Sequence, residues 1–271
     1  MKLSNMTVDE NFSFLFKSPP GFAKTCAAAS AAVFGPVHIS YFDKNKPVEL
    51  DKYFRYIVKR PELLDNIEYD IYGSANIHEW LNKIFEWGAR GCRYTTVITD
   101  SLTSLTGAAV NWSMGFRDPD PKRNKDDINS KSVQIIPDFD EYKVETSMVV
   151  QALDILMSLP VNVIWTAHPL PKIEISGSGR SMSITKTQTL VTYGNKVAGL
   201  VPGRFTEIYH FGKDIDWSQN PAKTKYICHT DSVGDDFAKS ALMLPKSFEF
   251  TDRLFFEVWR EEMAKFKEAN G

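Results

Sequence analysis

One stretch near the N-terminus constrains the fold more than any other part of the chain. Phe12 to Phe16 is a short apolar run typical of a buried strand, and a turn and the start of a helix follow it. The turn, Ser18 to Thr25 (SPPGFAKT), keeps the Lys and the hydroxyl residue of the pattern G-x-x-x-x-G-K-[ST]. Ser18 and Ala23 stand at its two outer glycine positions, with Gly21 between them. The stretch therefore predicts a phosphate-binding loop with altered glycines.

The residue types of this turn suit an anionic ligand. A loop that leads into a helix points backbone N–H groups at one spot, where the helix dipole favours negative charge. Lys24 is expected to reach the β- and γ-phosphates of a nucleotide, and the Thr25 hydroxyl is expected to ligate Mg²⁺. The other expected nucleotide contacts come from the loop and the residue after it: Ser18, Pro19, Pro20, Gly21, Phe22, Ala23 and Cys26. Because alanine carries a Cβ that glycine lacks, an ordinary strand–turn–helix corner with a surface lysine is the alternative.

Strands and helices alternate through most of the chain, which predicts an α/β fold with a mainly parallel sheet covered by helices on both faces. Ligands of such sheets bind at the carboxyl ends of the strands. The strands expected at 37–42, 94–99 and 161–167 end at Asp43, Asp100 and His168. An antiparallel strand pair is expected near the C-terminus, at 205–211 and 225–230.

Each of these polar residues has a functional role and a plainer alternative. Asp100 after an apolar, β-branched strand is the arrangement that holds Mg²⁺, but Asp100 could instead cap the helix that follows. His168 is placed to contact the γ-phosphate or the attacking water, and its alternative is a polar residue that starts a loop. Asp43 is preferred over Glu49 as the base that orients water, although either can simply be a cap or a solvated carboxylate.

Composition limits the function classes without choosing among them. Hydrophobic residues make up 43% of the 271 residues and charged residues 24%, as in ordinary globular proteins. The net charge of −2 gives no global electrostatic case for nucleic-acid binding, so any such contact needs a local basic patch. No apolar run is long enough for a membrane span, and the polar N-terminus lacks signal-peptide features. Three scattered cysteines predict reduced thiols in a cytoplasmic protein.

The remaining segments complete the expected organisation. Residues 1–250 are assigned to one ATPase-type domain and 251–271 to a C-terminal amphipathic helix, whose Trp259 and Phe266 either pack on the core or dock a partner. Arg117 to Lys131 and Lys172 to Gln188 are expected to be flexible loops, and the second is the natural segment to respond to nucleotide state. A helix is expected at 189–200.

The order of these pieces resembles the RecA-like core ATPases, and most of all the phage-encoded members associated with single-strand annealing recombination. The resemblance rests on the loop SPPGFAKT and on the strands YTTVITD and VNVIWTAH. Asp100-Ser101 and Thr166-Ala167-His168 match the family's strand ends, and Ala238 to Pro245 is similar to its closing region. The likeness spans Phe12 to Pro245.

This resemblance implies a RecA-like P-loop fold that binds ATP and Mg²⁺ and acts on single-stranded DNA in recombination or annealing, in the cytoplasm of a phage-infected host. It implies a ring or filament of identical subunits, in which a neighbour's basic residue reaches the γ-phosphate; Arg180, Lys213 and Lys239 are the candidates. It also places the segment after His168 near DNA or a neighbouring subunit. Turnover stays open, because the family's catalytic acid has no clear match. The alternatives are a nucleotide-binding scaffold, a DNA-packaging-type ATPase and a small-molecule kinase.

Overall fold

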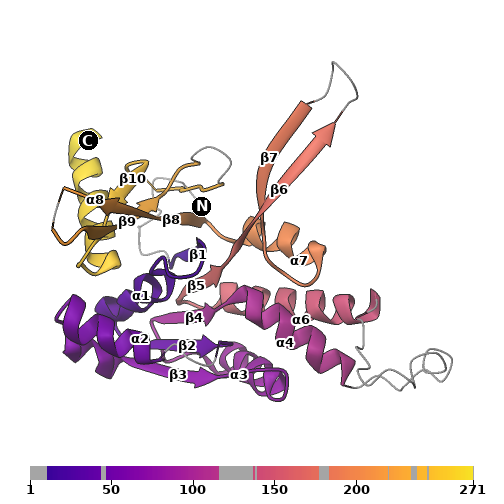
Figure 1. The fold of residues 1–271 in the computed structure, drawn as a ribbon. Helices are drawn as coiled ribbons and strands as arrows, with labels where there is room; N and C mark the ends of the chain where they lie inside the picture. The colour runs from indigo at the N-terminus through magenta and orange to yellow at the C-terminus, as the bar shows by residue number, and fades with distance from the viewer. Residues whose placement is uncertain are drawn as a thin grey trace.

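A computed structural model describes residues 11–43, 47–115, 137, 139–176, 183–218, 220–232, 237–242 and 244–270. Its centre is an eight-stranded sheet in the order β10-β9-β8-β1-β5-β4-β2-β3 (Figure 1). The strands are β1 (Ser13–Lys17), β2 (Val37–Tyr41), β3 (Ile67–Ile71), β4 (Thr96–Asp100), β5 (Asn162–Ala167), β8 (Glu207–Asp216), β9 (Lys223–His229) and β10 (Ser247–Glu249).

The six strands from β3 to β8 run parallel, whereas β9 and β10 are antiparallel. This confirms the α/β class, the mainly parallel sheet and the antiparallel C-terminal strands. The central strands are buried along their whole length, as expected for a sheet covered on both faces.

Helices cover both faces of the sheet, and each face has its own apolar core. One face carries α1 (Lys24–Ala29), η2 (Ser30–Phe34), α2 (Pro47–Lys52), η3 (Tyr53–Ile57), η4 (Pro61–Asn66) and α8 (Phe255–Asn270). The other carries α3 (Ile77–Arg90), α4 (Leu102–Met114), α6 (Phe139–Ser158), α7 (Asn195–Leu200) and η6 (Val201–Arg204). Successive side chains of β1 alternate between them, so Phe14 and Phe16 join the first core and Leu15 the second. None of the helices in the described ranges is long and apolar enough to cross a bilayer.

The C-terminal helix α8 packs on the core through Trp259, which is 2% exposed. Its indole Nε1 donates to the hydroxyl of Tyr209 at 3.0 Å, and its ring meets that of Phe14 edge-on at 5.7 Å. Packing on the core is therefore confirmed for Trp259. The side chain of Phe266 lies outside the described residues.

The flexible loop expected from Lys172 to Gln188 is wrong for 172–176 and 183–188, and 177–182 lie outside the described residues. Strands β6 (Pro169–Ser176) and β7 (Ser183–Leu190) pair antiparallel over their full length and form a ribbon that projects from the body of the protein (Figure 1). The Gly- and Ser-rich centre of the segment indicated a loop. It is flanked, however, by two runs in which isoleucine and threonine alternate with polar residues, a pattern typical of strands. The helix expected at 189–200 is also shorter than predicted. It spans Asn195–Leu200, and Thr189 and Leu190 belong to β7 instead. The segment Arg117 to Lys131 lies outside the described residues.

Candidate nucleotide-binding site

The loop from Ser18 to Ala23 leaves the centre of the sheet, because β1 lies between β5 and β8. Gly21 has a φ of 79°, and Ala23, which directly precedes α1, has a φ of 63° and a ψ of 13°. Ala23 thus occupies the left-handed region that favours glycine, at a cost of about 1–2 kcal/mol for an L-residue. The backbone has the conformation that the glycine of the pattern would supply, although the side chain is alanine.

Lys24 is turned back into the loop and is only 5% exposed. Its Nζ lies 2.7 Å from the carbonyl oxygen of Ser18, 3.1 Å from Ser18 Oγ and 3.1 Å from the carbonyl oxygen of Pro19. A buried ammonium needs such partners because it has lost its water. The alternative of a surface lysine is therefore wrong. Pro19, Pro20 and Gly21 form the exposed rim of the loop, while Phe22, Ala23 and Cys26 are half-buried.

Thr25 and Asp100 meet although 75 positions separate them. Thr25 Oγ1 donates to Asp100 Oδ2 at 2.7 Å, and the hydroxyl of Thr166 on β5 donates to Asp100 Oδ1. Asp100 is fully buried at the end of β4. It does not cap the following helix, because the Ser101 side chain accepts the hydrogen bond from Ser104 N. The helix-cap alternative for Asp100 is therefore wrong.

The pair of Thr25 and Asp100 fits a small divalent cation. A hydroxyl and a carboxylate oxygen 2.7 Å apart are hard donors of the kind that Mg²⁺ prefers. The ion keeps most of its coordination for water and phosphate oxygens, so two protein donors suffice. These two residues would hold the metal.

His168 follows β5 and faces the same loop. Its Nδ1 lies 3.1 Å from the carbonyl oxygen of Ser18 and 3.4 Å from Lys24 Nζ. A carbonyl oxygen can only accept a hydrogen bond, so we assign a proton to Nδ1, which then donates to Ser18. In a neutral ring this assignment leaves Nε2 as the acceptor nitrogen.

Asp43 lies on the neighbouring strand end. Tyr41 of β2 pairs with Asp100 of β4, and Asp43, two residues later, accepts a hydrogen bond from Ser104 Oγ in the first turn of α4. Glu49 is exposed in the first turn of α2. The structure thus brings Lys24, Thr25, Asp100 and His168 together, with Asp43 one strand further out; its role as base stays a prediction.

Two residues of this region were missed from the sequence. Thr166 had been singled out only as part of a matched strand end, yet it holds one oxygen of Asp100. Lys17 ends the apolar run of β1 and is nevertheless fully buried. A lysine that directly continues an apolar strand was the available signal for it.

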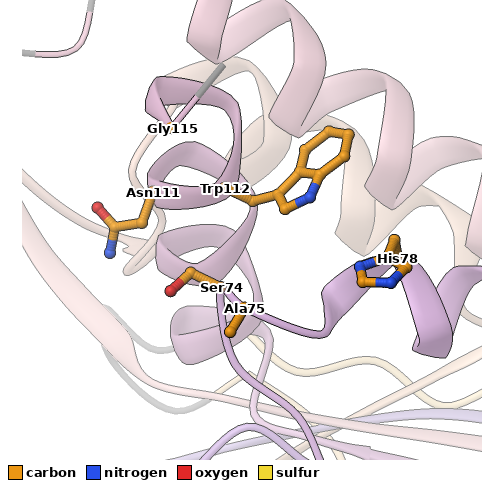
Figure 2. Close-up of a pocket in the computed structure, with 6 residues that line it drawn as sticks. All are labelled: Ser74, Ala75, His78, Asn111, Trp112 and Gly115. Atoms are coloured by element: carbon orange, nitrogen blue, oxygen red, sulfur yellow. The ribbon is translucent and has the colours of Figure 1, made fainter. Parts of the chain in front are cut away.

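A separate hollow of about 610 Å³ lies elsewhere on the protein (Figure 2). It is lined by Ser74, Ala75, His78, Asn111, Trp112 and Gly115. Figure 2 shows the last three at the C-terminal end of α4, about 20 Å along that 13-residue helix from Asp100. The hollow is therefore not part of the candidate site.

No family model matches the chain, and no curated protein matches it. Among solved structures it is similar to a KaiC-like protein from the hyperthermophilic archaeon Pyrococcus horikoshii, with 12% identity, 81% of this chain and 78% of that chain covered, and a TM-score of 0.43. It is also similar to the RadB recombinase, with 12% identity, 90% and 89% coverage and a TM-score of 0.44. Because identity and score are low, neither likeness assigns a function to this chain.

Proposed function

We propose that this protein is a RecA-like P-loop ATPase that binds Mg-ATP between the Ser18–Thr25 loop and the end of β4. The observation that carries the proposal is the convergence of Lys24, Thr25, Asp100 and His168, which come from three different stretches of the sequence. Three adjacent parallel strands, β1, β5 and β4, deliver them to one edge of the sheet, where ligands of such sheets bind.

The chemistry follows from the position of each group. Lys24 neutralises and orients the β- and γ-phosphates, since its ammonium is already held at the centre of the loop. Mg²⁺, when bound at Thr25 and Asp100, supplies further neutralisation of the phosphates. His168 stands beside the lysine and contacts the γ-phosphate or the attacking water. Asp43 is the proposed base that orients this water.

The β6–β7 ribbon favours the proposal that the ATPase binds a partner. The ribbon starts one residue after His168, and an isolated two-stranded ribbon is at best marginally stable in water, so a bound partner would stabilise it. We propose single-stranded DNA as this partner, in phage recombination or annealing, with identical subunits arranged in a ring or filament. Of the three candidate basic residues for a neighbouring site, Lys213 and Lys239 are exposed and Arg180 lies outside the described residues.

The test is ATP turnover by the purified protein, with and without single-stranded DNA. The Lys24→Ala variant is the test variant, and Lys52→Ala, which removes an exposed lysine of α2, is the matched control. We expect turnover that rises with DNA, disappears in Lys24→Ala and persists in Lys52→Ala. Turnover that survives in Lys24→Ala would contradict the proposed site.

A nucleotide-binding scaffold with little turnover is the second candidate. The Cβ of Ala23, at a left-handed position next to Lys24, favours it, because close phosphate approach usually requires glycine there. Nucleotide binding without hydrolysis, in the presence or absence of DNA, would select this function.

A further inference from the structure

Lys17, the last residue of β1, is a buried cation that the nucleotide chemistry above does not use. Its exposed fraction is 0%, and it lies between Ala167 of β5 and His210 of β8. Its Nζ donates to Gln188 Oε1 at 3.0 Å and lies 4.0 Å from the centroid of the Phe237 ring. An apolar side chain would fill this place without the desolvation cost of an ammonium, so the lysine contributes directed contacts rather than packing alone.

The contact with Gln188 connects Lys17 to the β6–β7 ribbon, which is called the β6–β7 hairpin from here on. Gln188 lies near the base of β7, while the other strand, β6, begins directly after His168. His168 in turn lies 3.1 Å from the carbonyl oxygen of Ser18. Two consecutive residues, Lys17 and Ser18, therefore contact the two sides of the hairpin base, at the point where β1 becomes the phosphate-binding loop.

A third contact connects the hairpin to the metal side of the site. Val191 follows β7, and its carbonyl oxygen accepts a hydrogen bond from Thr103 Oγ1 at 2.9 Å. Thr103 lies in the first turn of α4, three residues after Asp100. The hairpin base is thus held by β1, by the residue that follows β5 and by α4, and each of these adjoins the candidate nucleotide-binding residues in the chain.

This attachment allows a small movement at the base of the hairpin to produce a larger movement at its far end. Eight residues per strand give a length of about 26 Å, and the two strands lie about 5 Å apart. When the paired strands turn as one rigid body, a movement of about 1 Å between the attachments of the two strands at the base displaces the far end by about 5 Å. Small movements of the phosphate-binding loop are amplified if the base contacts are rigid.

We propose that Lys17 is a positioning residue that couples the phosphate-binding loop to the β6–β7 hairpin through Gln188. The inference rests on the proposed function, since it takes a nucleotide as the ligand of the loop. Nucleotide binding then changes how rigidly the hairpin base is held, and with it the affinity of the hairpin for a ligand such as single-stranded DNA. By linkage, that ligand changes the affinity for nucleotide by the same factor.

Hydrogen exchange of the backbone amides at 187–191 in the full chain, with and without Mg-ADP, tests the coupling. In the natural protein we expect Mg-ADP to change the exchange rates by about fivefold or more. In Lys17→Met the dissociation constant of a fluorescent ADP analogue should stay within about threefold, while the change at 187–191 falls below about twofold. Thr187→Ala, an exposed neighbour on the same strand, is the matched control and should behave like the natural protein.

Two variants of Gln188 keep the test decisive if Lys17→Met does not fold. Gln188→Glu retains an acceptor for the ammonium and should preserve the transmitted change, whereas Gln188→Leu removes the acceptor and should abolish it. A full transmitted change in Lys17→Met or in Gln188→Leu would overturn the inference. So would a natural protein that binds Mg-ADP with no change at 187–191. Absence of nucleotide binding in the natural protein would instead contradict the proposed function itself.

Discussion

Replacing Ala23 with glycine should stabilise the protein, although a glycine substitution in the interior of a helix usually does the opposite. Ala23 has a φ of 63°, and the left-handed conformation costs an L-residue about 1–2 kcal/mol. Glycine removes that cost but adds about 0.5–1 kcal/mol of unfolded-state entropy. The net gain is on the order of 0.7 kcal/mol in the free energy of unfolding, equivalent to a rise of about 2 °C in Tm for a chain of this size.

Denaturant and thermal unfolding of Ala23→Gly measure this gain directly. Ala27→Gly is the matched control, because Ala27 is a buried alanine in the right-handed conformation of α1 and should lose about 1–2 kcal/mol. Lys59→Gly, at the exposed residue with a φ of 55°, should change stability in the same direction as Ala23→Gly. A loss of stability in Ala23→Gly comparable to that in Ala27→Gly would refute the reasoning.

Three further predictions concern a buried carboxylate, the metal site and the C-terminal helix. Burial raises the pKa of Glu145 from 4.5 to about 7, so the folded state binds the proton more tightly. Its stabilising contribution is complete below pH ~4.5 and is lost by pH ~7; the difference in unfolding free energy between the natural protein and Glu145→Gln should therefore fall by on the order of 3 kcal/mol across that window in urea titrations. Asp100→Asn should weaken binding of a fluorescent nucleotide about tenfold in Mg²⁺ and have little effect in EDTA, and equal losses in both would contradict a metal role. Trp259→Ala should cost about 3–5 kcal/mol in denaturant unfolding, whereas a cost below about 1 kcal/mol would contradict the packing of α8 on the core.

The sequence was sufficient to predict the elements that carry the site. Short apolar strands that end in a single polar residue indicated where Asp100 and His168 would lie, and the parallel sheet brings both to the loop that holds Lys24. The sheet and its C-terminal antiparallel strands followed from the same alternation of strands and helices.

Contacts between distant parts of the chain could not be predicted in this way. The β6–β7 hairpin was hidden because its strands flank a Gly- and Ser-rich centre and pair only with each other, so neither shows the continuous apolar run of a buried strand. The bond between Lys17 and Gln188 joins residues 171 positions apart, and no local pattern specifies such a partner. Likewise, Ser101 rather than Asp100 caps α4, a difference of one residue that depends on backbone geometry.

Calorimetric titration of Mg-ATP into the natural protein and into Lys24→Ala tests the nucleotide site most directly, because it requires neither turnover nor DNA. We predict saturable binding at one site per chain in the natural protein, weakened when Mg²⁺ is removed and lost in Lys24→Ala. Absence of binding in the natural protein, or equal binding in Lys24→Ala, would contradict the assignment of the Ser18–Thr25 loop as a phosphate-binding loop.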